Sequence, residues 1–405
     1  MNDSDPRCSN KSFSRPVVVR QSLASLADNF SAPYIGYYLA ALTSSGVLQG
    51  ILQFSLNSLP TLSQVLLGSF IDRLRKYIMI LLITSVTASS LWILISLTLD
   101  PLILVGLYTL RAVAVGISGL ALIAFIGAFY SSHERGKILS TITIASQITA
   151  LLAFVTVGFL INPSIDLLRI LFIVSGIISL IGSLIWLNML YLDSCLESSE
   201  RKSSEISISK SFKIILENRS FMKFDYAFSG YILAMSFAWP YFAVAQVYLY
   251  RMSVSDLAIL NIISTLSTMI SQYILMKILP RTDLKKLVII SRIGFVTPPL
   301  FYAVSPNIEY IYISNLIIGP FQAITNVVIP LYTLEVSEKR FQASHLAFLN
   351  FSQGVTAAVG SIIGGFTMDR FVRLYGYEGL RIGFAISTVF RILTTIPFIK
   401  IDKVR

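Results

Sequence analysis

The stretch Gly68–Lys76 reads GSFIDRLRK, in which a single acid is followed by three bases within four positions. Apolar runs adjoin it on both sides, at residues 46–70 and 77–99, and each is long enough to cross a bilayer as a helix. The stretch is therefore expected to be a very short loop at a membrane surface. Its positive charge indicates the cytoplasmic surface, where loops between spans are rich in Lys and Arg.

The composition of the whole chain agrees with a membrane location. Of its 405 residues, 55% are hydrophobic and 13% are charged, whereas about 25% of the residues in soluble domains are charged. A membrane barrel is excluded because its strands would alternate polar and apolar residues. The sequence predicts an all-α integral membrane protein with twelve transmembrane helices. The twelve apolar runs lie at residues 18–41, 46–70, 77–99, 102–130, 137–160, 167–191, 221–248, 255–279, 287–304, 308–334, 341–367 and 379–399.

The distribution of basic residues predicts the orientation. Most of the 32 Lys and Arg residues lie in the two tails and in alternate loops, which would face one side; Arg20 is counted here with the N-terminal tail. The positive-inside rule then places both termini in the cytoplasm, as an even number of spans requires. The net charge of +11 is thus an orientation signal in a plasma-membrane protein, and no nucleic-acid partner is expected.

The chain is expected to consist of two similar halves. A shift of about 205 to 208 positions places Gln64 on Gln272 and Arg73 on Arg281, at matching positions within the spans. A duplicated six-helix unit explains this offset, and parallel repeats of this kind occur in one large class of secondary transporters. The expected parts are a cytoplasmic tail at 1–17, a six-helix bundle at 18–191, a cytoplasmic linker at 192–220, a second six-helix bundle at 221–399 and a cytoplasmic tail at 400–405.

The opening stretch is similar to a loop motif of one transporter family, G-x-x-x-D-R-x-G-R-K between the second and third spans. Gly68, Asp72 and Arg73 match it, as do the bases Arg75 and Lys76, although the second Gly of the motif is missing. Together with twelve spans, two halves and a central linker, this motif makes the chain resemble a member of the major facilitator superfamily over essentially its whole length. The resemblance implies two six-helix bundles that rock about a central cavity.

The resemblance also implies an inner gate at Gly68, Asp72 and Arg73. Gly68 would let two helices approach closely, and Asp72 would bind a base or a helix N-terminus when the gate is shut. The alternative is that the bases of this loop only set the membrane topology.

Asp28 is interpreted as the only acid well inside an apolar run, and Arg111 is its expected partner. Helix rise places Asp28 about 12 Å from the inner end of its span and Arg111 about 15 Å from the outer end of its own, so the two depths nearly coincide. A conformational change that separates the two could load or release a proton, because burial and a neighbouring guanidinium act in opposite senses on a carboxyl group. The alternative is a static ion pair that holds two helices together.

Polar side chains at helical spacing predict the walls of a substrate cavity. Amides dominate among them, which favours a neutral or weakly charged solute, although such residues can also join helices to one another. The predicted cavity residues are Tyr34, Gln53, Asn57, Gln147, Trp239, Asn261, Gln272, Asn315, Gln322 and Asn326.

The motifs that the sequence lacks narrow the function further. It contains no P-loop for ATP, no Cys/His cluster for a metal and no recognisable set of nucleophile and base, so an enzyme, a metal site and a cofactor are not expected. The sequence predicts a monomeric, proton-coupled secondary transporter of a small organic solute. The alternatives are an exporter of amphipathic compounds by drug/proton antiport and a membrane sensor of the same fold that transports nothing.

Overall fold

The computed structural model describes residues 14–74, 76–130, 132–159, 165–193, 214–338 and 341–403. Within these ranges every regular element is a helix. The chain divides into two compact units, one formed by Met1–Leu42 with Leu59–Ser204 and the other by Thr43–Ser58 with Glu205–Arg405. Arg75 and most of the expected linker, residues 194–213, lie outside the described residues.

The first unit is built from long helices whose ends follow local sequence signals. Pro33 interrupts the first expected span, because a prolyl nitrogen cannot donate within a helix, and a short 3₁₀ turn results there. Asp100 accepts from the backbone N–H groups of Leu102 and Ile103 and so begins the next long helix at Pro101. The elements are α1 (Ser14–Ser31), η3 (Ala32–Tyr34), α2 (Ile35–Leu42), α4 (Leu59–Leu74), α5 (Tyr77–Leu97), α6 (Pro101–Phe129), α7 (Ser132–Gly158) and α8 (Ile165–Leu187).

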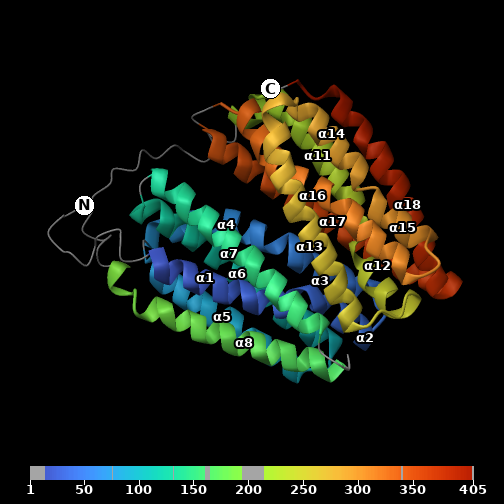
Figure 1. Cartoon of the computed structure of the whole chain (residues 1–405), viewed down its shortest axis with the longest axis horizontal. Coiled ribbons are helices and arrows are strands. Elements are labelled where there is room, and N and C mark those ends of the chain that lie inside the picture. Colours follow the sequence, from blue (N-terminus) through green and yellow to red (C-terminus); the bar gives the residue numbers. More distant parts are fainter. Residues whose placement is uncertain are drawn as a thin grey trace. The chain divides into compact units, whose positions relative to one another are not determined.

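These helices pack along one another, with α5 between α6 and α8 and with α1 in contact with both α7 and α8 (Figure 1). A core of large apolar side chains, including Phe125 and Trp186, joins their inner faces. On α8 the side chains of Ile170, Ile177 and Leu184 are exposed instead. An exposed apolar face of this kind suits a helix that borders lipid.

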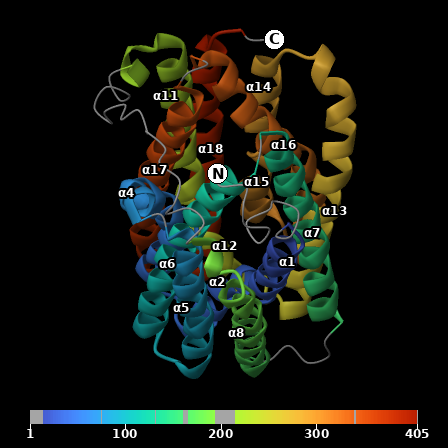
Figure 2. The ribbon, with the colours of Figure 1, turned by 90° about the vertical axis from the view of Figure 1, so that its left-hand side faces the viewer.

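The second unit contains more interrupted helices, and prolines account for several of the breaks. Pro240 separates α11 from α12, and Pro298 and Pro299 stand at the start of α15. The elements are α3 (Gly46–Asn57), α11 (Arg219–Phe237), α12 (Trp239–Val244), the π-helix η4 (Ala245–Leu249), α13 (Val254–Ile278), η5 (Leu279–Arg281), α14 (Leu284–Gly294), α15 (Thr297–Val304), α16 (Ile308–Val336), α17 (Gln342–Tyr375), η7 (Gly376–Glu378), α18 (Gly379–Thr395) and η8 (Ile396–Lys400). Two pairs, α11 with α17 and α13 with α16, run side by side (Figure 2).

Nine helical segments of the described residues are long and apolar enough to cross a membrane. The last of them, Ser344–Lys400, contains two of the expected runs, which the turn at Gly376 separates with a positive φ of 63°. The helices of the first two expected runs are not among the nine. The described residues thus form a helical fold with several helices that could cross a membrane, and the count of twelve crossings stays a prediction.

Candidate functional site

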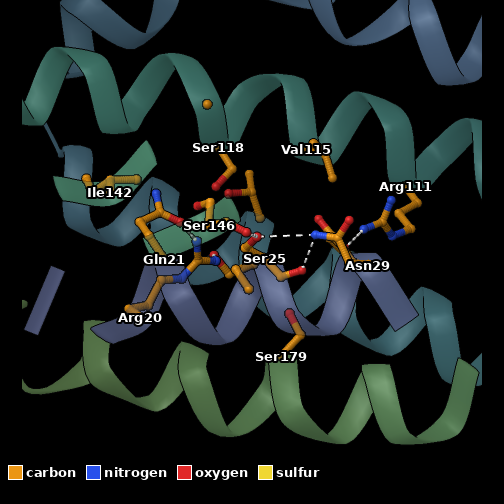
Figure 3. A pocket seen from close by; sticks show the side chains of 16 residues that line it. Arg20, Gln21, Ser25, Asn29, Arg111, Val115, Ser118, Ile142, Ser146 and Ser179 are labelled. Atoms are coloured by element: carbon orange, nitrogen blue, oxygen red, sulfur yellow. Dashed lines mark hydrogen bonds and ion pairs between the residues drawn. The ribbon is translucent and has the colours of Figure 1, made fainter. Parts of the chain in front are cut away.

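A polar cavity of about 420 Å³ lies within the first unit. Its walls come from α1, α5, α6, α7 and α8, and its volume falls within the range of small-molecule sites. Side chains with hydroxyl and amide groups contribute to its lining, among them Ser25, Asn29, Ser118, Ser146 and Ser179. Figure 3 shows Arg20 and Arg111 at opposite ends of this group of side chains. The cavity therefore offers hydrogen-bonding groups along its length and a cation at each end.

The expected ion pair between Asp28 and Arg111 is present at one end of the cavity. Asp28 lies on α1 and Arg111 on α6, and Nη2 of the arginine donates to Oδ1 of the carboxylate. The indole Nε1 of Trp92 donates to the same oxygen over 3.4 Å. The guanidinium carbon of Arg111 lies 4.3 Å from the centre of the Trp92 ring, so a cation–π contact also holds it.

The two partners of this ion pair differ in their access to the cavity. The Asp28 side chain is 42% exposed and the Arg111 side chain is 6% exposed. The carboxylate can thus be reached from the cavity, while the guanidinium is enclosed by Trp92, Tyr108 and the carboxylate itself. A proton or a solute entering the cavity would meet the acid of the pair first.

Arg20, which was counted with the bases of the N-terminal tail although it lies inside the first expected span, forms the other charged end of the cavity. It lies within α1, and only 6% of the residue is exposed. Nη1 donates to Gln21 Oε1 over 2.7 Å, and Nη2 donates to Ser85 Oγ over 2.5 Å. Its guanidinium carbon lies 5.4 Å from the centre of the Trp186 ring. No carboxylate of the described residues forms an ion pair with it.

Hydropathy alone does not show the environment of Arg20. Polar residues precede it and the apolar run begins close to it, so the helix start cannot be told apart from the tail by hydropathy alone. In the structure α1 begins at Ser14, which places Arg20 well inside the helix.

The residues predicted to line a substrate cavity lie elsewhere in the two units. Tyr34 is fully buried in η3, and Gln147 is on α7 next to the lining residue Ser146. The others belong to the second unit: Gln53 and Asn57 on α3, Trp239 on α12, Asn261 and Gln272 on α13, and Asn315, Gln322 and Asn326 on α16. None of the ten lines the 420 Å³ cavity. Their contact with a substrate stays a prediction.

Several of these amides bond to their own helices. Asn261 Nδ2 donates to the Leu257 carbonyl over 2.9 Å, and Asn315 Nδ2 donates to the Ile311 carbonyl over 3.0 Å. Gln322 donates to the side chain of Asn326 over 2.9 Å. An amide that is already paired within its own helix offers one fewer donor to a solute.

The predicted gate residues Gly68, Asp72 and Arg73 all belong to α4, which continues to Leu74. Their side chains lie outside the part of the structure that is described. The gate assigned to them therefore stays a prediction.

Asp225 is a buried acid that the sequence analysis missed, so Asp28 is not the only acid inside an apolar run. Asp225 lies on α11 and is 3% exposed. Ser352 of α17 donates to its Oδ1 over 2.6 Å, and Ser229 donates to Ser352 over 3.1 Å. The apolar residues on both sides of Asp225 were the available signal, but Lys223 made this part of the helix look like a membrane boundary.

A second carboxylate of the second unit lies at a close contact between α3 and α17. Asp369 accepts from the backbone N–H of Gly46 over 2.5 Å and from that of Val47 over 3.2 Å, so it caps the first turn of α3. A Cβ on Gly46 would collide with the Gly365 carbonyl, and a Cβ on Gly50 would approach the Ser361 carbonyl. Glycine is therefore needed for these two helices to pack this closely.

The comparisons with known proteins identify the family. The model of the Major Facilitator Superfamily matches residues 19–281, and the model named "Sugar (and other) transporter" matches residues 213–402. The chain belongs to the Major Facilitator Superfamily. No curated protein sequence matches it.

Solved transporter structures share the superfamily fold over nearly the whole chain. The nucleoside transporter NupG is 14% identical, with a TM-score of 0.75, and the match covers 96% of this chain and 99% of that one. The peptide transporter POT, in the form of a point mutant, is 10% identical with a TM-score of 0.71, covering 96% and 97%. The xylose transporter XylE from E. coli, in an inward-open conformation, is 14% identical with a TM-score of 0.66, covering 97% of each chain. At these identities the likeness shows the fold of a multi-pass transporter.

Proposed function

We propose that this protein is a secondary active transporter that moves a small organic solute across the cell membrane by alternating access, with coupling to protons. The observation that carries the proposal is the Asp28–Arg111 ion pair at the end of a polar cavity. Twelve transmembrane helices in two six-helix bundles, both termini in the cytoplasm and a monomeric state complete the proposal. The solute and the proton would be its partners within the bilayer.

The asymmetry of the ion pair supports a role in proton transfer. The Asp28 carboxylate is accessible from the cavity, whereas Arg111 is fixed by the Trp92 ring. Protonation of Asp28 would remove the attraction between the two helices that carry the pair, α1 and α6. The protonation state of Asp28 would thereby change how α1 and α6 pack, and so change the relative populations of the conformations of the protein. Coupling of proton binding to solute movement requires such a change in populations.

The contact between α3 and α17 supports alternating access. By sequence α3 belongs to the N-terminal half of the chain and α17 to the C-terminal half, and the start of α3 is expected at the outer membrane surface. A glycine-lined contact held by Asp369 suits an outer gate in its closed state. Gly68, Asp72 and Arg73 would form the inner gate. The hydroxyl and amide groups of the cavity can form hydrogen bonds with a polar solute.

The proposal is tested by proton movement in proteoliposomes that contain a pH-sensitive dye. The solutes to add are nucleosides, sugars and short peptides, the classes named for the similar structures. We expect at least one of them to drive proton flux with the parent protein, and we expect Asp28→Asn to abolish that flux. Asp166→Asn should retain it, because the Asp166 side chain is 81% exposed and lies in the same unit away from the cavity.

Two results would contradict the proposal in different ways. Solute uptake by Asp28→Asn with unchanged pH dependence would show that the ion pair is only structural. Binding of a solute without any movement across the membrane would instead indicate a sensor.

A further inference from the structure

We infer that the cavity of the first unit takes a solute with a single carboxylate group, which binds Arg20. This inference rests on the proposed function, because it names the chemical class of the transported solute. It goes against the expectation of a neutral solute, which was based on the amides of other helices.

The charged groups that line the cavity do not balance. Two guanidinium groups, Arg20 and Arg111, face one carboxylate, Asp28. Asp28 is paired with Arg111, so one positive charge is left without a counter-charge among the described residues. An arginine stays protonated inside proteins and cannot remove its charge by losing a proton. A buried cation of this kind is stabilised when an anion enters the cavity.

The bonds of Arg20 leave it able to bind such an anion. Its present acceptors are the neutral groups Gln21 Oε1 and Ser85 Oγ, and its Nε has no hydrogen-bond partner in the described structure. The planar fork of a guanidinium matches the two oxygens of a carboxylate, and charged hydrogen bonds of this type are stronger than bonds to neutral acceptors. A carboxylate could therefore replace the neutral acceptors of Arg20.

The length of the cavity suits a solute that is polar as well as anionic. Arg20 and Asp28 are eight residues apart on α1, which corresponds to about 12 Å along the helix. The side chains of Ser25, Asn29 and Ser146 lie between the two charged ends (Figure 3). They can donate to and accept from hydroxyl or amide groups of the solute. While Asp28 is ionised, the lining carries one unpaired positive charge, which a single carboxylate balances.

Transport of such a solute with a proton would carry no net charge across the membrane. One carboxylate and one proton on Asp28 add up to no net charge. Uptake of the anion together with a proton should therefore not respond to the membrane potential.

Binding is tested with pairs of solutes that differ chiefly in charge. Thermal unfolding of the purified, detergent-solubilised protein is measured with gluconate against glucose, nicotinate against nicotinamide, pantothenate against panthenol and orotate against uracil. We expect at least one carboxylate to raise the melting temperature, while its neutral partner at the same concentration does not. That carboxylate should bind Arg20→Gln at least tenfold more weakly, and Arg20→Lys should fall between this variant and the parent because it keeps the charge but not the fork.

Arg169→Gln is the matched control. Arg169 is also an arginine of the first unit, but it donates to the Ser96 carbonyl over 2.8 Å and does not line the cavity. This variant should bind the carboxylate as the parent does. If Arg20→Gln does not fold, Arg20→Lys still tests the contact, since unchanged affinity in that variant would show that the guanidinium fork is not used.

Several outcomes would overturn the inference. These are stabilisation by the neutral members of the pairs, no stabilisation by any of the carboxylates, and unchanged carboxylate binding in Arg20→Gln. Proton-coupled transport of a neutral solute would refute the carboxylate inference alone and leave the proposed function standing. Absence of proton-coupled movement of both the neutral and the anionic solutes would count against the proposed function itself.

Discussion

The two units hold their buried charges in different surroundings. In the first unit Arg20, Asp28 and Arg111 line a cavity. In the second unit Arg391 and Arg292 lie in a packed core and are 2% and 1% exposed. Arg391 donates to the Phe295 carbonyl over 2.5 Å and to the Met235 carbonyl over 3.0 Å.

Arginine has two different roles in these two units: it joins helices in the second unit, and it lines a cavity in the first. Arg391 binds backbone carbonyls at the end of α14 and in α11, where broken helices leave acceptors that lipid could not satisfy. Arg292 donates to the hydroxyl of Thr325 and lies 5.0 Å from the centres of three aromatic rings. Such cations join helices. A cation beside a cavity, in contrast, can exchange a neutral partner for a solute.

The strongest effect on stability should come from removing a core arginine rather than a cavity arginine. Arg391→Met should lower the free energy of unfolding by about 1–3 kcal/mol, because it leaves the buried Phe295 carbonyl without a donor and the Met235 carbonyl with only the N–H of Ala238. Arg20→Gln should lower it by less than about 1 kcal/mol, because relief of an unpaired buried charge offsets the lost hydrogen bonds. Thermal and denaturant unfolding in detergent measure both. If Arg20→Gln proves as damaging as Arg391→Met, Arg20 is a structural residue and the contrast between the units disappears.

The second largest effect on stability is expected at Asp369, a carboxylate that joins α3 and α17. Asp369→Ala removes the acceptor for two N–H groups of α3 and should cost about 0.5–2 kcal/mol, as the loss of a helix cap does. It should also open the α3–α17 contact. After replacement of Cys8 and Cys195 by Ser, a cysteine introduced at Ser44 should react faster with an impermeant maleimide in Asp369→Ala. Equal rates in Asp369→Ala and in the Asp166→Asn control would show that Asp369 holds no gate.

A weaker effect is expected at Asp225, the buried acid of the second unit. Asp225→Asn keeps the shape of the side chain and the oxygen that accepts from Ser352, so stability should change by less than about 1 kcal/mol. Proton flux in proteoliposomes should persist, unlike in Asp28→Asn. Loss of flux in Asp225→Asn would show that the coupled proton binds in the second unit. The contrast between a cavity charge in the first unit and packed charges in the second would then be wrong.

The weakest effect is expected at Asp402, a partly exposed acid near the C-terminal end. The hydroxyl of Ser220 and the ammonium of Lys223, the latter over 3.1 Å, lower the pKa of Asp402. A carboxyl group with a lowered pKa stabilises the fold above its unfolded pKa of about 3.9, and this contribution is lost as the pH falls through the folded pKa. The effect should be a few tenths of a kcal/mol, because the pair is solvated.

Melting temperatures of the parent and Ser220→Ala between pH 3 and pH 6 measure this contribution. The difference between the two proteins should be present at pH 6 and should shrink as the pH falls below the unfolded pKa of about 3.9. A difference that does not depend on pH would assign the effect of Ser220 to packing.

Hydropathy predicted the helices well because the bilayer imposes one physical demand on every span. Backbone groups in lipid must be paired within the segment, so a long apolar run can only be a helix. The depth argument for Asp28 and Arg111 succeeded for a related reason, since helix rise converts sequence position into depth. Arg20 and Asp225 were misjudged because each lies near the end of an apolar run, where hydropathy does not show whether a side chain points inward.

Local patterns in the chain were enough to predict the helical membrane fold, the superfamily resemblance and the partner of Asp28, because these follow from periodicity, motif spacing and depth. Only the folded protein shows that Arg20 enters the cavity, that Asp225 is enclosed by α17 and that Asp369 caps α3 across 323 positions of the chain. Contacts of this kind depend on which helix faces pack together. Packing depends on the fit of many side chains at once, so it cannot be predicted from a local pattern in the sequence.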